Sequence, residues 1–328
     1  MNPPVLNVRN LTTVFDTRGG TVTAVNDVSF SVGKGEILGL VGESGSGKSQ
    51  TAYSLMNLVD RPGRITAGHI ELNGHDLAGL GEEGWRRVRG RRIAMIFQDP
   101  MLTLNPVLRI DTQMIEAVQA HSGASRQQAR EIARECLVKV GIASPDERLA
   151  CYPHQFSGGM RQRVAIAIAL IHRPEVIIAD EPTTALDVTI QEQILFEMQT
   201  LARESGTALV WITHDLSVVA GLADRVAVMY AGRIVESGPA AQILAKPSHP
   251  YTAALLDSVP ARNPRGVPLF QIPGAPPNLL EQAGGCAFRP RCPKARAACA
   301  DDIPVLTSGE AAVRCLAPHR ALQEALAA

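Results

Sequence analysis

Two stretches near the start of the chain alternate apolar and polar residues, which is the pattern of half-buried strands. Residues 5–15 and 24–32 show this alternation, and Gly19 and Gly20 lie between them. A glycine pair between two alternating runs is typical of a β-hairpin. We therefore expect an antiparallel β subdomain in this part of the chain.

Short apolar runs alternate with helical segments along most of the remaining chain. Strands are expected at residues 37–41, 65–72, 92–97, 176–179, 208–212 and 225–230. Helices are expected at residues 48–59, 189–203 and 216–222. This alternation favours an α/β fold with a mainly parallel sheet core. Within residues 100–172, helical spacing at residues 110–120 and 126–140 predicts a helical insertion.

The composition changes after about residue 246, where prolines become frequent. Four of the six cysteines lie farther along the same region, within residues 286–315. Such a shift in composition marks a domain boundary. We therefore predict two domains, residues 1–245 and 246–328, of which the second is small and contains the cysteines.

Composition and charge exclude several classes of protein. The 328 residues are 45% hydrophobic and 20% charged, which excludes low-complexity disorder as the main state. Lys and Arg total 32, as do Asp and Glu, whereas a protein that coats nucleic acid needs a basic excess. The longest strongly apolar run, residues 164–171, is too short to span a membrane, and residues 1–10 hold no apolar signal core. We expect a cytoplasmic chain without a nucleic-acid partner.

A phosphate-loop pattern, G-x-x-x-x-G-K-[ST], lies directly after an expected strand and begins an expected helix. Its glycines let the backbone wrap closely, so that N–H groups can point at phosphate oxygens. We expect Lys48 to reach the β- and γ-phosphates and the Ser49 hydroxyl to ligate Mg²⁺. The context favours nucleotide binding over a chance glycine turn. The loop residues expected to bind the nucleotide are Gly42, Ser44, Gly45, Gly47, Lys48 and Ser49.

A second motif consists of an apolar strand at residues 176–179 that ends in two acids, Asp180 and Glu181. A carboxylate in the position of Asp180 can hold Mg²⁺, and Glu181 can polarise the attacking water. An ordinary strand followed by a solvated turn has the same pattern. The phosphate loop upstream makes the catalytic interpretation the better one.

Several further motifs follow in an order that resembles one family, the ATP-binding subunits of ABC transporters. Residues 156–163, Phe-Ser-Gly-Gly-Met-Arg-Gln-Arg, resemble its LSGGQ signature motif, with Phe156 and Met160 in place of Leu and Gln. Gln98 resembles the Q-loop glutamine, residues 185–187 the D-loop, and His214 the switch histidine. This resemblance covers residues 5–240.

The resemblance implies a P-loop NTPase cassette that hydrolyses ATP with Mg²⁺. It implies catalytic roles for Glu181, His214 and Gln98. It also implies that Gln98 contacts Mg²⁺ together with Ser49 and Asp180.

The resemblance further implies that two cassettes close head-to-tail around two ATP molecules. Ser157, Gly158 and Gly159 would then contact the γ-phosphate that the partner cassette holds, and Asp187 would lie in the D-loop. Phe15 is expected to stack on adenine, with plain core packing as the alternative.

The region beyond the cassette resembles the C-terminal region of oligopeptide and dipeptide transporters. Residues 248–252 (SHPYT), 272–277 (IPGAPP) and 285–292 (GCAFRPRC) carry this similarity. It implies an ATP-hydrolysing, energy-coupling subunit of a di- or oligopeptide importer, with nickel importers as close relatives and an open alternative. The implied partners are a second ATPase, as a paralogue in a heterodimer, two membrane permeases and an extracytoplasmic peptide-binding protein. The implied location is peripheral, on the cytoplasmic face of the inner membrane.

The four C-terminal cysteines, Cys286, Cys292, Cys299 and Cys315, have the spacing of neither zinc fingers nor bacterial ferredoxins. Four thiolates can nevertheless ligate one [4Fe–4S] cluster, and the basic residues between them would offset its negative charge. Some members of the resembled family carry such a cluster here. Structural zinc and reduced thiols remain open.

Two other functional classes are less favoured. ABC ATPases that act on nucleic acid or ribosomes usually have two cassettes or a long coiled coil, whereas this chain has one phosphate loop and no long heptad region. A regulatory subunit that barely hydrolyses ATP would have lost Glu181 or His214, and both are present. The arginine-rich residues 86–92 are interpreted as a solvated face.

Overall fold

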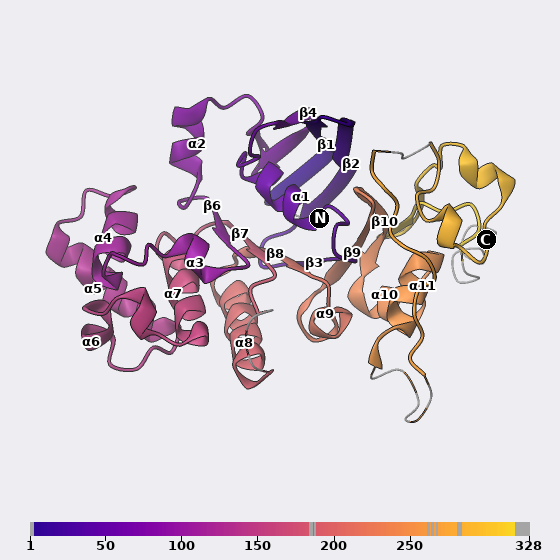
Figure 1. Ribbon diagram of the computed structural model, residues 1–328. Helices are drawn as coiled ribbons and strands as arrows, with labels where there is room; N and C mark the ends of the chain where they lie inside the picture. The colour runs from indigo at the N-terminus through magenta and orange to yellow at the C-terminus, as the bar shows by residue number, and fades with distance from the viewer. Residues whose placement is uncertain are drawn as a thin grey trace. The chain divides into compact units, whose positions relative to one another are not determined.

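The computed structural model describes residues 3–183, 186, 188–260, 263, 266, 268–280 and 284–318, without the side chain of Leu102 (Figure 1). The chain forms two compact units. Unit 1 consists of Met1–Leu6, Val32–Glu36 and Gly79–Val210, and unit 2 of Asn7–Ser31, Ile37–Ala78 and Trp211–Ala328. The predicted domains, residues 1–245 and 246–328, have other bounds and stay a prediction. In the part of the chain that is described, no helix is both long and apolar enough to cross a membrane.

Unit 1 is mainly helical. Helix α5 packs against both α4 and α7, and Figure 1 shows these helices grouped with α6. The helices predicted at residues 110–120 and 126–140 are confirmed as α4 and α5, whereas α2 and the short helices were not predicted. The helices are α2 (Glu82–Val88), α3 (Pro100–Thr103), α4 (Ile110–Gln119), α5 (Arg126–Lys139), α6 (Pro145–Leu149), the 3₁₀ turn η1 (Pro153–Gln155), α7 (Gly158–Leu170) and α8 (Val188–Ser205).

Helix α5 shows why the sequence folds this way. A capping box begins it: the Ser125 side chain accepts from the Gln128 N–H, and the Gln128 side chain accepts from the Ser125 N–H. Ala129, Ala133 and Leu137 recur at four-residue spacing and are fully buried. This spacing places them on one helix face, so burial of that face holds α5 against its neighbours.

Two parallel strands of unit 1 position the acidic motif. Strand β6 (Ile93–Ile96) pairs with β7 (Val176–Asp180), with Ile93 opposite Val176. Both strands are buried on both faces, which explains their continuous apolar sequences. Because the strands are parallel, Gln98 and Glu181, which follow them, lie at the same edge of the sheet.

Unit 2 contains the remaining strands. The predicted antiparallel subdomain is the sheet β2-β1-β4-β5. The other strands of the unit follow in the order β11-β12-β10-β9-β3. Strand β3 is parallel to β9, whereas the pairs β9/β10, β10/β12 and β11/β12 are antiparallel. Strand β8 (Ala208–Thr213) runs from unit 1 into unit 2. The bounds are β1 (Leu6–Thr17), β2 (Gly20–Val32), β3 (Ile37–Val41), β4 (Gly63–Leu72), β5 (His75–Asp76), β9 (Arg225–Tyr230), β10 (Arg233–Pro239), β11 (Leu306–Ser308) and β12 (Ala311–Val313).

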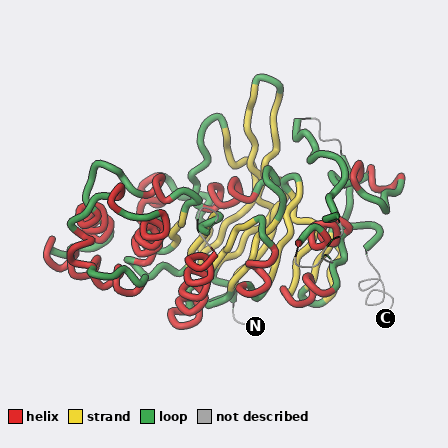
Figure 2. Tube along the Cα trace, turned by 60° about the horizontal axis from the view of Figure 1, so that its bottom comes forward, coloured by secondary structure: helices red, strands yellow, loops and turns green. Residues whose placement is uncertain are grey.

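The α/β fold is thus confirmed, while β10, β11 and β12 were not predicted. Helix α1 is also shorter than the predicted residues 48–59, because Asn57 adopts a left-handed backbone with φ of 48° just after it. Most of the described residues after α11 lie in loops and turns (Figure 2). The helices of unit 2 are α1 (Lys48–Leu55), α9 (Leu216–Leu222), α10 (Ala240–Ala245), α11 (Pro250–Asp257) and the 3₁₀ turns η3 (Arg289–Arg291) and η4 (Ala297–Ala300).

Candidate ATP-binding site

The predicted phosphate loop joins β3 to α1 in unit 2, as expected. A Cβ on Gly42 would lie 2.2 Å from the Met229 carbonyl oxygen. Gly47 has φ of +103°, and a Cβ there would lie 2.3 Å from the Ala24 oxygen. Only glycine fits these two positions, so the loop can wrap as tightly as a phosphate group requires.

The loop presents a positive, partly unsatisfied surface. Lys48 is buried, and its Nζ donates to the Gly42 oxygen at 2.8 Å and to the Glu43 oxygen at 3.0 Å. Ser46 Oγ is buried with no hydrogen-bond partner among the described residues. The first N–H groups of α1 add partial positive charge at the same end of the helix. A buried cation, a polar atom without a partner and a helix N-terminus together fit the phosphates of a nucleotide.

The acidic motif lies in unit 1, at the end of β7. Asp180 is 2% exposed, whereas Glu181 is half-buried. Glu181 has φ of 44°, a left-handed conformation uncommon for a residue with a side chain. Gln98 Nε2 donates to Glu181 Oε2 at 3.3 Å, so the structure brings together two of the three predicted catalytic residues. Asp180 offers a carboxylate, which is an oxygen ligand that suits Mg²⁺.

The predicted signature residues begin α7 in unit 1. Ser157 is the N-cap, and its hydroxyl accepts a hydrogen bond from the Met160 N–H at 3.3 Å. A Cβ on Gly158 would meet nothing within 4 Å, so the helix start is open at this residue. Together with Gly159 these residues form the helix N-terminus that the sequence predicts, and their contact with a partner's nucleotide stays a prediction.

The remaining residues predicted for the nucleotide site are His214, Phe15 and Asp187. His214 follows β8, is exposed, and lines a cavity of about 400 Å³ with the end of α11. The Phe15 ring is half-buried against Gly63, so its stacking on adenine stays a prediction. Asp187 lies outside the described residues.

The structure does not support the predicted iron–sulfur cluster. In residues 284–318, Cys299 and Cys315 are buried and Cys286 and Cys292 half-buried. Burial raises the pKa of Cys286 and of Cys292, and raises that of Cys315 to about 11. Across the described part of the chain, no group of three or more His, Cys, Asp or Glu side chains is arranged to hold a metal ion. The cluster stays a prediction, and no step of the reaction involves it.

The arginine-rich segment lies on and after α2. Arg87 pairs with Glu83 at 3.6 Å, and Arg92 pairs with Glu175 at 2.6 Å. The Arg89 guanidinium lies 5.3 Å from the centre of the Trp85 ring. These arginines are engaged within the chain, which agrees with a solvated, ion-paired face.

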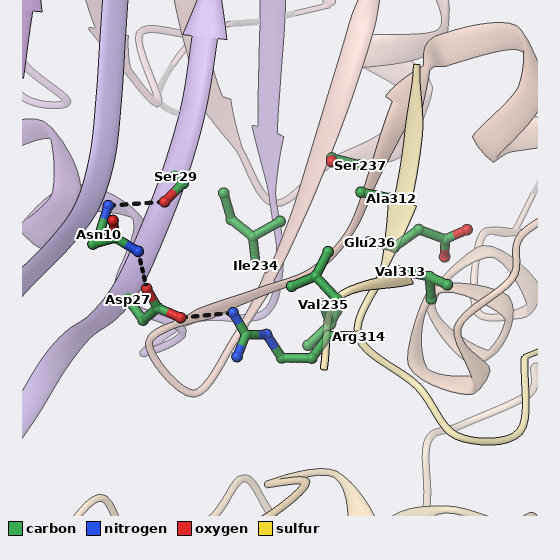
Figure 3. A pocket seen from close by; sticks show the side chains of 11 residues that line it. Asn10, Asp27, Ser29, Ile234, Val235, Glu236, Ser237, Ala312, Val313 and Arg314 are labelled. Atoms are coloured by element: carbon green, nitrogen blue, oxygen red, sulfur yellow. Dashed lines mark hydrogen bonds and ion pairs between the residues drawn. The ribbon is translucent and has the colours of Figure 1, made fainter. Parts of the chain in front are cut away.

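A separate cavity of unit 2, of about 190 Å³, lies beside β10 and β12 (Figure 3). Asn10 Nδ2 donates to Asp27 at 2.7 Å, and Arg314 donates to the other Asp27 oxygen at 2.8 Å. No residue predicted for ATP chemistry lines this cavity. The hydrogen bond to Asp27 connects Arg314, near the end of the described chain, to strand β2.

Two contacts to the phosphate loop were missed by sequence reasoning. The Glu43 N–H donates to Tyr251 Oη at 2.9 Å, and Arg291 Nη1 donates to Glu43 Oε2 at 2.8 Å. These partners lie 208 and 248 positions away along the chain. No local pattern signals a contact over such separations. The sequence marked Arg291 only as a basic residue between cysteines.

Comparisons with known proteins agree with this geometry. Residues 25–184 match the model of the family "ABC transporter", and residues 235–299 match "Oligopeptide/dipeptide transporter, C-terminal region". The oligopeptide transport ATP-binding protein OppD of Escherichia coli K12 is 50% identical over 301 residues, covering 92% of this chain and 89% of that protein. The dipeptide transport ATP-binding protein DppD of Bacillus subtilis 168 is 50% identical over 296 residues, covering 90% and 88%.

Solved structures agree with the fold. The ATP-binding cassette MJ0796, in a dimeric post-hydrolysis state bound to ADP and Pi, has a TM-score of 0.65 and 28% identity. The match covers 72% of this chain and 98% of the cassette. With a phosphate loop, an acid-ended strand and a signature helix in the expected order, the chain belongs to the ATP-hydrolysing subunits of the ABC transporter family, in the branch with an oligopeptide/dipeptide transporter C-terminal region.

Proposed function

We propose that this chain is the ATP-hydrolysing subunit of an importer for dipeptides or oligopeptides, and that it drives uptake through membrane permease subunits. The observation that carries the proposal is the match of residues 235–299 to the C-terminal region of oligopeptide and dipeptide transporters. The names of relatives at 50% identity, which also concern oligopeptide and dipeptide transport, support it.

The reaction is attack of water on the γ-phosphorus of ATP. A bond forms between the water oxygen and phosphorus, the bond to the oxygen that bridges the β- and γ-phosphates breaks, and ADP leaves. Glu181 accepts the proton of the attacking water, and Gln98, which donates to Glu181, orients that carboxylate. His214 donates to the γ-phosphate. Lys48 and the loop N–H groups hold the phosphates, and their positive charge stabilises the charge that develops in the transition state.

Three side chains could supply oxygen ligands to Mg²⁺. Ser49 offers its hydroxyl at the start of α1, and Asp180 its buried carboxylate at the end of β7. Gln98 is the further ligand that the family resemblance implies. A Mg²⁺ ion held by these residues would neutralise negative charge on the phosphates. The donor set of hydroxyl, carboxylate and amide oxygens matches the preference of this cation.

The partners follow from the same proposal. A second ATPase chain, a paralogue, places its signature helix against the ATP held here, and Ser157, Gly158 and Gly159 of this chain contact the partner's ATP. Phe15 stacks on adenine, and Asp187 contributes to the contact between cassettes. Two permeases form the pathway, and an extracytoplasmic binding protein delivers the peptide. The chain then lies peripherally on the cytoplasmic face of the inner membrane.

The test is uptake of a labelled tripeptide and of radioactive nickel by cells that carry either the wild-type chain or Glu181→Gln as their only copy. Loss of tripeptide uptake alone in the variant supports the proposal. Glu192→Gln, the same chemical change at an exposed position of α8, is the matched control and should keep wild-type uptake.

Loss of nickel uptake alone would instead assign the chain to the nickel importers. If neither flux changed, the transport proposal itself would be wrong. Purified wild-type and variant chains should still bind ATP in every case, because binding depends on Lys48 rather than on Glu181.

A further inference from the structure

The phosphate loop is fastened to the C-terminal part of unit 2 by a buried arginine. Arg291 donates from Nη1 to Glu43 Oε2 at 2.8 Å and from Nη2 to Glu43 Oε1 at 3.1 Å. The Arg291 side chain is 5% exposed and the Glu43 side chain 25%. A two-point contact between guanidinium and carboxylate fixes orientation as well as distance. Because Glu43 directly follows Gly42, this contact acts on the loop itself.

The other donors of Arg291 are also used. Nε donates to the Pro273 oxygen at 2.9 Å, Nη1 to Tyr230 Oη at 3.1 Å, and Nη2 to the Ile272 oxygen at 3.5 Å. A guanidinium has five N–H donors, and here each has an acceptor. A lysine could not reproduce this set, because its ammonium is a compact point charge on a flexible stem. Arg291 is therefore a rigid anchor for the carboxylate it binds.

Three buried rings complete the anchor. Tyr230, Tyr251 and Phe288 are at most 2% exposed, with ring centres 4.5 Å apart for Tyr230 and Tyr251 and 5.4 Å for Tyr251 and Phe288. The guanidinium lies 5.8 Å from the ring centres of Tyr230 and Phe288. Tyr251 Oη accepts from the Glu43 N–H at 2.9 Å. We call Arg291, Tyr230, Tyr251 and Phe288 the Arg291 cluster. Within it, Tyr251 holds the backbone of Glu43 and Arg291 holds its side chain.

The C-terminal segment also lies directly against the loop. Pro276, Pro277 and Leu279 line a small cavity of about 20 Å³ together with loop residues 43–46 and with Tyr230 and Ala231. The Arg291 cluster and this segment therefore contact the same end of the phosphate loop.

We propose that Arg291 is a positioning residue for the ATP site, which holds the phosphate loop through Glu43 in the shape that receives the phosphates. The inference rests on the proposed function, because it concerns the ATP site described there. A loop that is already in its bound shape loses less conformational freedom on binding, so its affinity for ATP is higher. Through this contact the C-terminal region controls how tightly the cassette binds ATP.

The test is a double-mutant cycle in the full-length chain with Glu43→Gln, Arg291→Gln and the double variant. Binding is measured by titration with a fluorescent MgATP analogue. Each single variant should raise the Kd about tenfold, and the double variant should bind no more weakly than the weaker single one. Arg291→Lys keeps the charge but loses the two-point contact, so it should behave like Arg291→Gln. Arg296→Gln, an exposed arginine of the same region, is the control and should leave the Kd unchanged.

Steady-state hydrolysis separates positioning from a merely structural role. The KM for ATP should rise with the Kd, while kcat at saturating ATP stays within about twofold of wild type. An unchanged Kd in both single variants, or effects that multiply in the double variant, would overturn the inference. So would a fall in kcat at constant KM.

Circular dichroism melts show whether each variant folds. If Arg291→Gln does not fold, Glu43→Gln tests the same contact with Arg291 in place, and Tyr251→Phe tests the neighbouring hydrogen bond from the Glu43 N–H. An unchanged Kd in both variants overturns the inference. If the wild-type chain itself binds no MgATP, the proposed function is wrong. If the wild-type chain binds MgATP and the variants bind it equally well, only the inference about Arg291 is wrong.

Discussion

The phosphate loop of unit 2 and the acid-ended strand of unit 1 prepare their functional groups in different ways. The loop is held from several sides: Tyr251 and Arg291 bind Glu43, and the Gly232 N–H donates to the Ser46 oxygen at 2.8 Å. On the strand, the buried Asp180 is followed by the half-buried Glu181, whose backbone is left-handed. Contacts from several sides thus fix the shape of the phosphate loop. At the end of the buried strand, by contrast, only the Glu181 carboxylate becomes partly exposed.

The difference reflects what each group has to do. Phosphate oxygens are bound by many N–H groups at once, so the affinity depends on the shape of a whole loop. Proton transfer depends on one carboxylate within hydrogen-bond reach of a water. We therefore expect that substitutions in the loop change the affinity for MgATP, whereas substitution of Glu181 changes the rate of ATP hydrolysis.

The largest expected effect is at Glu181. Glu181→Gln keeps the size and hydrogen-bonding ability of the side chain but cannot accept the proton of the attacking water. Turnover should fall about 10³-fold, within the range for loss of a general base, while the Kd for MgATP stays within about threefold. Single-turnover hydrolysis and equilibrium titration of the same preparation measure the two quantities. A variant that hydrolyses ATP at the wild-type rate would remove Glu181 from the mechanism.

The second expected effect is at Lys48, in the other region. Lys48→Ala removes the buried cation that lies beside the Gly42 and Glu43 carbonyl oxygens. Because a charge-assisted hydrogen bond to phosphate is lost, the Kd for MgATP should rise about 100-fold. Isothermal titration with MgATP measures it, and Lys34→Ala, outside the loop, is the control. Equal affinity in variant and wild type would mean that the loop does not bind the phosphates through Lys48.

A smaller effect is expected at Gln98, which donates to Glu181 at 3.3 Å. Gln98→Ala removes a hydrogen bond that orients the carboxylate, so turnover should fall about tenfold with little change in the Kd for MgATP. If Gln98 also ligates Mg²⁺, the half-saturating Mg²⁺ concentration rises in the variant. Hydrolysis measured across a Mg²⁺ series tests both roles, and unchanged turnover at every concentration would contradict them.

The two regions also differ in how far sequence predicts them. The phosphate loop, Asp180 and Glu181 are short continuous motifs, and each was expected on the strand or helix where it lies. The hydrogen bond from Gln98 to Glu181 follows from two parallel strands, which the apolar runs predict. Arg291 and Tyr251 could not be found in this way, because their contacts with Glu43 depend on how distant segments pack.

For the cysteines, the sequence pattern alone was not enough to predict the chemistry. Four thiols in one window suggested a metal, but spacing alone does not state their burial or protonation. Burial raises the pKa of Cys315 to about 11, and among the described residues no three or more His, Cys, Asp or Glu side chains are arranged to hold a metal ion. Three-dimensional surroundings therefore decide chemistry that residue type leaves open.

The smallest expected effect concerns the other arginine contact of the C-terminal region, between Arg314 and Asp27. The Asp27 carboxylate accepts a hydrogen bond from Arg314 at 2.8 Å, and the side chain of Asp27 is 39% exposed and that of Arg314 15%. Burial raises the pKa of Asp27. Hydrogen bonds from Asn10 and Arg314 outweigh this effect, so the pKa lies below its usual 3.8. Asp27→Asn keeps the size of the side chain, and asparagine tolerates the φ of 56° at this position.

At neutral pH, Asp27→Asn should lower the free energy of unfolding by only about 0.5–1 kcal/mol, because solvent screens a half-exposed pair. A lowered pKa stabilises the fold above the unfolded-state pKa, and this contribution is lost as the pH falls through the folded-state value. In urea titrations the difference between wild type and variant should therefore shrink as the pH falls below the unfolded-state pKa of 3.8, and vanish once the pH is below the folded-state pKa. The Kd for MgATP should not change. If Asp27→Asn weakened MgATP binding as much as Arg291→Gln, then any loosening of the C-terminal region would disturb the loop, and the contact through Glu43 would have no special role.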